Sequence, residues 1–108
     1  MSTGTGMQEE RVRKVVIRLD DDKRPLIDKG DECIVLDRSK NEAILWVSSV
    51  PFRIDFRGDS PFYEDQFDST HAHSGLARRN IVGSKVRTYK YSIEINGQIL
   101  DPGVKIDP

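Results

Sequence analysis

The chain has 108 residues, of which 36% are hydrophobic and 32% charged, so it can form one core but not two and does not have the composition of a disordered chain. Seventeen lysines and arginines face eighteen acidic residues, for a net charge of -1, and this balance excludes the basic excess that a nucleic-acid partner requires. No apolar run of membrane-spanning or signal-peptide length is present and Cys33 is the only cysteine, so we expect a cytoplasmic protein with no membrane partner and no intrachain disulfide.

The chain divides into a short leader and one domain. Residues 1–10 are polar and glycine-rich at their start, which predicts a flexible N-terminal leader. We expect residues 11–108 to form a single β-sandwich domain. Its first strand is predicted at residues 12–19, because apolar side chains recur there at every second position. These positions are Val15, Ile17 and Leu19.

Two short apolar segments follow, at residues 33–36 and 43–47. Polar breaks at residues 20–25 and 37–41 separate them from each other and from the first strand. The second segment is apolar on both faces, which predicts a strand inside a sheet. Cys33 has an acidic neighbour and lies in the apolar strand, so we expect a packed structural cysteine and not a nucleophile.

The clearest strand signals lie at residues 52–56 and 89–95, where apolar and polar residues alternate strictly. The second strand ends in Asn96–Gly97, a pair typical of a two-residue hairpin turn. The returning strand covers residues 98–106 and is broken at a proline, which predicts a bulge or an edge strand. The predicted inward side chains are Phe52, Ile54, Phe56, Tyr89, Tyr91, Ile93 and Ile95.

The segment at residues 58–83 is longer than most loops of compact domains, and such loops are often functional. Residues 60–67 predict one short helix within it. Ser60 is a good helix cap, the proline after it suits the first helical position, and Tyr63 and Phe67 are one turn apart.

These elements predict an all-β fold: a Greek-key β-sandwich of six to seven strands, with one short helix in a long crossover loop. Two strand orders fit the pattern, a cupredoxin-like order and an immunoglobulin-like order.

Two stretches resemble cupredoxin-like domains. Trp46 with residues 50–56 is similar to their central strand, and the hairpin from residue 89 to residue 106 is similar to their last two strands. The resemblance implies the cupredoxin-like sandwich fold. In that family a cysteine, a histidine and usually a methionine near the last strands bind copper, whereas no such residue follows His73 here. The resemblance therefore implies a domain that lacks the copper ligands, and we expect no cofactor.

His71 and His73 are the only residue pair with metal-ligand spacing, because in an extended segment both rings project to one side. Asp65, Asp68 and Glu64 are near enough in sequence to add a third ligand. Catalytic metal sites normally need three protein ligands, however, and a polar loop of this kind is usually solvated. A metal-binding cupredoxin-like protein that uses His71 and His73 is therefore the alternative function, and a solvated loop the favoured interpretation.

The residues of the long loop also suggest a binding surface. Phe62, Tyr63 and Phe67 lie near Arg78 and Arg79 in sequence, and these residue types are enriched at protein interfaces. The alternative is that the aromatic side chains fill the core.

No catalytic motif is present, so we do not expect an enzyme. We expect a non-catalytic interaction module that binds an unidentified protein partner or itself as a homo-oligomer. Edge strands at residues 33–36 and 104–106 offer a further way to pair with a neighbour.

Overall fold

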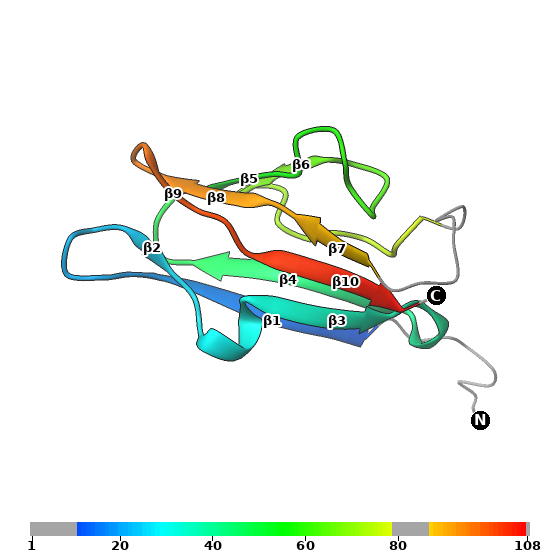
Figure 1. Cartoon of the computed structure of the whole chain (residues 1–108). Helices are drawn as coiled ribbons and strands as arrows, with labels where there is room; N and C mark the ends of the chain where they lie inside the picture. The colour runs from blue at the N-terminus through cyan, green and yellow to red at the C-terminus, as the bar shows by residue number, and fades with distance from the viewer. Residues whose placement is uncertain (1–10, 79–86, 108) are drawn as a thin grey trace, which may run out of the picture.

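Apolar side chains that alternate along short strands close two layers of sheet over one core (Figure 1). The computed structural model describes residues 11–78 and 87–107. The predicted all-β sandwich is confirmed for these residues. None of their helices is long and apolar enough to cross a membrane.

The first layer is built on a long parallel pair of strands. Strand β1 (Arg11–Leu19) runs parallel to β4 (Glu42–Ser48), and β2 (Pro25–Leu26) pairs with the end of β1. On the other side of β4, the backbone of the segment at residues 72–74 bonds to it, with Trp46 N–H donating to the Ala72 carbonyl at 3.0 Å. Strand β4 therefore has a hydrogen-bonded neighbour along each edge, which confirms the prediction that residues 43–47 form a strand inside a sheet.

The second layer combines two groups of strands. One group has the order β6 (Gln66–Asp68), β5 (Arg53–Asp55), β8 (Ser92–Ile95) and β9 (Gln98–Leu100). The other has the order β3 (Cys33–Asp37), β10 (Gly103–Asp107) and β7 (Arg87–Lys90).

A backbone hydrogen bond joins these groups. Only Tyr91 separates β7 from β8, only residues 101–102 separate β9 from β10, and Tyr91 N–H donates to the Pro102 carbonyl at 3.1 Å. The predicted break in the last strand is thus an interruption within one continuous layer.

Aromatic rings from both layers meet in the core. Trp46 of β4 lies 5.1 Å from Phe67 of β6 and 5.7 Å from Tyr91, measured between ring centroids. All the inward positions predicted for residues 52–56 and 89–95 are buried. The predicted hairpin is also present, with positive φ angles at Asn96 and Gly97. The strands that carry the strongest alternation therefore define the core.

The helix predicted at residues 60–67 is wrong. This segment is a turn followed by β6, and the described residues contain only two short 3-10 helices, at Lys29–Asp31 and Arg38–Lys40. The Ser60 hydroxyl does accept the Phe62 N–H at 3.0 Å, as a cap would, but it donates to the Glu64 carbonyl and closes a turn. Tertiary pairing of β6 with β5 buries Phe67 and prevails over the local helix signal.

The edge strands are also assigned differently by the structure. Residues 104–106 belong to β10, which lies between β3 and β7, so the prediction that they form an edge is wrong. Strand β3 does lie at an edge, as predicted.

The prediction that Cys33 of β3 is a packed structural cysteine is wrong. Its side chain is exposed, because Ile34 and Leu36 are the side chains of this strand that point inward.

Candidate functional site

The outer face of the second layer carries rows of polar side chains that cross four strands. Because Ile54 points into the core, its neighbours on β5, Arg53 and Asp55, point outward. Arg53 is paired in register with Asp68 of β6 on one side and Glu94 of β8 on the other. One row across the sheet is therefore Asp68, Arg53, Glu94 and Ile99.

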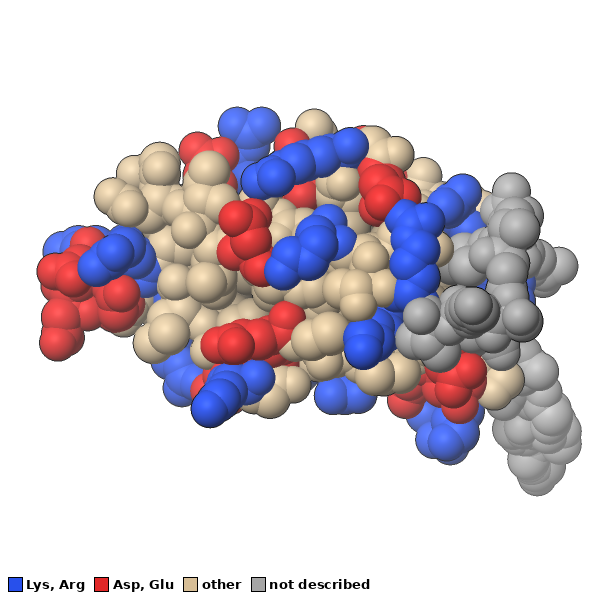
Figure 2. Space-filling model, in the orientation of Figure 1, with Lys and Arg blue, Asp and Glu red and all other residues tan. Residues whose placement is uncertain are grey.

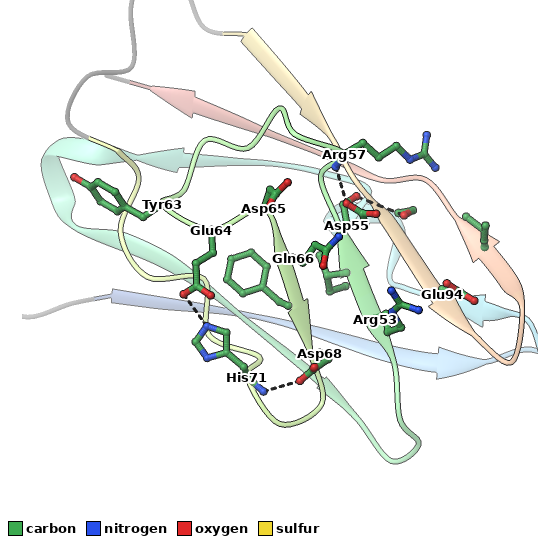
Figure 3. Close-up of a pocket in the computed structure, with 14 residues that line it drawn as sticks. Arg53, Asp55, Arg57, Tyr63, Glu64, Asp65, Gln66, Asp68, His71 and Glu94 are labelled. Atoms are coloured by element: carbon green, nitrogen blue, oxygen red, sulfur yellow. Dashed lines mark hydrogen bonds and ion pairs between the residues drawn. The ribbon is translucent and has the colours of Figure 1, made fainter.

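These rows form the floor of a groove of about 740 Å³. We call it the outer groove, and we define it by the side chains that line it (Figure 3). Its wall beside β6 comes from the loop at residues 63–65 and from His71. The lining includes five carboxylates and two guanidinium groups, which gives the groove an acidic excess. These charged residues are Asp55, Glu64, Asp65, Asp68, Glu94, Arg53 and Arg57.

Arg57 contributes less to the groove than its position suggests. It follows β5 with a φ of 57°, and its guanidinium Nη2 lies 3.2 Å from the Asp101 carboxylate. Arg53, in contrast, has no ion-pair partner among the described residues. Glu94 also has no ion-pair partner among the described residues, although Arg53 and Glu94 are register partners and lie side by side in Figure 3. The centre of the groove therefore presents an acid and a base that are both available to a ligand.

His71 is held firmly at the wall of the outer groove. Its ring stacks on Phe67 with 5.7 Å between centroids, and its Nε2 lies 2.9 Å from the Glu64 carboxylate (Figure 3). The Asp68 carboxylate accepts the backbone N–H of His71 at 3.0 Å and bonds to Thr70 through both N–H and hydroxyl. The side-chain hydrogen bond from Thr70 lowers the pKa of Asp68. This tight turn fixes the position of the imidazole.

The structure places the two histidines in different layers. His71 bridges to Asp68, beside the second layer, whereas His73 bridges to Leu45 of β4 in the first layer. The His73 Nδ1 accepts the Gly75 N–H at 3.0 Å. Within residues 11–78 and 87–107, no group of three or more His, Cys, Asp or Glu side chains is arranged to hold a metal ion.

The predicted partner-binding aromatics separate into buried and exposed positions. Phe62 and Phe67 are 1% and 3% exposed, so the prediction that they anchor a partner is wrong and they belong to the core. Phe62 is buried because its backbone bridges to Ala77, and Phe67 because β6 pairs with β5. Tyr63 lies between them and is 70% exposed. It is the one predicted aromatic that a partner can reach.

Arg78 lies partly buried behind this loop. Its backbone N–H donates to the Pro61 carbonyl at 2.8 Å, and its buried Nε has no hydrogen-bond partner in the described part of the chain. Arg79 lies outside the described residues.

Most of the outer groove has no signal in the sequence. The alternation at residues 52–56 did place Arg53 and Asp55 on the solvent side, and the Asn96–Gly97 turn sets Glu94 opposite Ile99. These signals were sufficient to predict an exposed face. The pairing of β6 with β5, which adds Gln66 and Asp68 to the groove, has no local signature.

The rest of the visible surface is electrostatically mixed. In Figure 2, basic and acidic side chains alternate over the face that carries β3 and β10, with no extended area of one sign.

No protein-family model, curated protein or solved structure matches this chain.

Proposed function

We propose that this protein is a non-catalytic interaction module whose outer groove binds an extended basic segment of a partner protein. The observation that carries the proposal is the lining of the groove, with five carboxylates against two guanidinium groups. Complementary charge steers association and selects the partner. A segment with lysine or arginine side chains matches this lining.

Apolar contacts on both sides of the groove support a protein ligand over a small cation. Tyr63 projects beside β6, and Ile99 lies 56% exposed on β9. Tyrosine supplies a large contact area at low entropic cost and is frequent at binding hot spots. A segment that crosses the strands from Tyr63 to Ile99 passes over Arg53 and Glu94, whose polar groups it can hydrogen-bond.

The ionisation of Asp68 supports a binding role over acid–base catalysis for this carboxylate. A general acid at neutral pH needs a raised carboxyl pKa. Hydrogen bonding moves the pKa of Asp68 in the opposite direction, which keeps it charged and available to attract a cation.

The cupredoxin-like relationship is likewise a proposal. Immunoglobulin-type sandwiches are built from antiparallel sheets. The parallel pairs β1–β4 and β3–β10 favour the cupredoxin-like order over the immunoglobulin-like one.

Selection from a random peptide library displayed on phage tests the proposed function, with the full chain as the target. We expect the selected peptides to be rich in lysine and arginine. Their affinity should fall roughly tenfold with Tyr63→Ala and with Glu94→Lys, because each change removes a groove contact. Asp21→Lys makes the same charge change on an exposed turn outside the groove and is the matched control. Peptides that bind all these variants equally well, or that lack basic residues, would contradict the proposal.

A further inference from the structure

The outer edge of β3 is open in the described chain. Strand β3 ends the order β3–β10–β7, and no described strand pairs on its other side (Figure 1). An open edge presents unpaired N–H and C=O groups, which form a template for another strand. Proteins often protect such edges with short strands or inward charges. Here the edge instead exposes two uncharged side chains, Cys33 and Val35, the latter 48% accessible.

The hydrogen-bond register shows which backbone groups point outward. Gly103 N–H donates to the Glu32 carbonyl at 2.8 Å. In a parallel ladder the following bonds toward β10 then come from Ile34 and Leu36. The backbone groups of Cys33, Val35 and Asp37 therefore face the open side. The Asp37 N–H confirms this direction, because it donates to the Glu42 carboxylate at 2.6 Å and not to β10.

Unpaired charges of opposite sign flank the same strand. Glu32 lies three residues before Val35 and Arg38 three residues after it. Neither forms an ion pair with another described residue. Glu32 comes just before β3 and Arg38 just after it. An antiparallel pair of two β3 strands with its two-fold axis at Val35 therefore brings the end that carries Glu32 in one copy to the end that carries Arg38 in the other. A parallel pair in register would instead set like charges against each other, which is destabilising.

We propose that two copies of this chain associate through β3, antiparallel and centred on Val35, and so join their second layers into one continuous sheet. The surface is distinct from the outer groove, so this inference is independent of the proposed function. Val35 becomes a hydrogen-bonded pair with its own copy, since its N–H and C=O both face outward. The two-fold symmetry makes every contact occur twice, including the pair between Glu32 and Arg38.

Cysteine crosslinking tests the register directly. In a hydrogen-bonded antiparallel pair the Cα atoms are about 5.5 Å apart, which suits a disulfide. A Val35→Cys variant in a Cys33→Ser background should therefore form disulfide-linked dimers under mild oxidation. In the unmodified chain, Cys33 and its copy lie about 14 Å apart along the strands, and we expect no such dimer. The control is Val47→Cys in the same background, an exposed valine on β4 of the other layer.

A charge swap tests the flanking pair by a second measurement. Sedimentation equilibrium over a wide concentration range should show a monomer–dimer equilibrium. Glu32→Arg and Arg38→Glu should each raise the dimer dissociation constant by roughly tenfold, because each replaces two attractions by two repulsions. The variant that carries both Glu32→Arg and Arg38→Glu should return the dissociation constant to that of the unmodified chain. Thermal melting at a concentration at which the unmodified chain is monomeric should be unchanged, which shows that each variant is folded.

Three results overturn this proposal. The first is a chain that remains monomeric at every concentration, and the second is a Val35→Cys variant that crosslinks no faster than Val47→Cys. The third is a double charge swap that does not recover the dimer.

Discussion

The indole Nε1 of Trp46 lies 3.3 Å from the phenolic oxygen of Tyr91, and this hydrogen bond connects the two layers inside the core. Both side chains are 1% exposed. The indole can only donate, so the Tyr91 hydroxyl is the acceptor that satisfies it. The bond fixes the relative position of β4 and the strand that passes from β7 to β8.

Removal of this acceptor should destabilise the fold. In Tyr91→Phe the buried indole N–H loses its partner, and an unsatisfied buried donor costs about 1–3 kcal/mol. Urea denaturation followed by tryptophan fluorescence measures the change. Tyr89→Phe is the control. Tyr89 is also a buried tyrosine, but its hydroxyl forms no hydrogen bond with another described residue. Equal losses in the two variants would show that the Trp46 bond contributes nothing particular.

The same residue gives the protein a specific sensitivity to alkali. Burial raises the pKa of Tyr91 from 10.0 to about 12. Below pH 10 the group is protonated in both the folded and the unfolded state and has no effect on stability. Between pH 10 and about 12 the unfolded state loses this proton first, so the free energy of unfolding falls as the pH rises. Tyr91→Phe should lack this part of the fall, although lysines and other tyrosines still titrate. Parallel stability curves for the two proteins above pH 10 would contradict the assignment.

A close approach between β7 and β10 requires glycine at position 103. A Cβ built on Gly103 would lie 2.8 Å from the Thr88 methyl group. Because threonine is branched at Cβ and cannot easily move aside, Gly103→Ala should cost about 1–3 kcal/mol of unfolding free energy. Gly103→Ala combined with Thr88→Ala should recover most of this loss. Gly30→Ala, with open space around the added methyl group, should leave the stability nearly unchanged in the same denaturation assay.

Truncation of two aromatic residues near each other in the long loop should change the free energy of unfolding by very different amounts. Phe67→Ala removes a ring that contacts Trp46 and Phe56, and the cavity should cost about 3–5 kcal/mol. Tyr63→Ala should change stability by about 0.5 kcal/mol or less, because its side chain is mostly exposed. Thermal denaturation separates the two effects. A large loss of stability with Tyr63→Ala would show that this residue is structural and would remove it from the outer groove as a contact.

The contrast between these two residues also shows how far local sequence reaches. At residues 60–67, capping and spacing signals favoured a helix that would have placed Tyr63 and Phe67 on one side. In the structure Phe67 enters the core and Tyr63 faces water. The deciding interaction is the pairing of Ile54 with Phe67 across β5 and β6, which joins segments that no sequence pattern connects.

The sequence by itself determined the inward faces of the strands in which apolar and polar residues alternate strictly. Side chains alternate across a strand with a period of two, so the pattern at residues 52–56 and 89–95 specifies which residues are buried, whatever the neighbouring strands. The Asn96–Gly97 turn fixes one strand pair for the same local reason.

Only the tertiary structure decided which strands lie side by side. That order places β3 at an edge and β10 inside the layer, and it sets Arg53 between Asp68 and Glu94. Pairing between distant strands depends on how the whole core closes, because each layer must bury its apolar face against the other. The outer groove and the open edge of β3 are both consequences of this closure, and neither is encoded in any single segment.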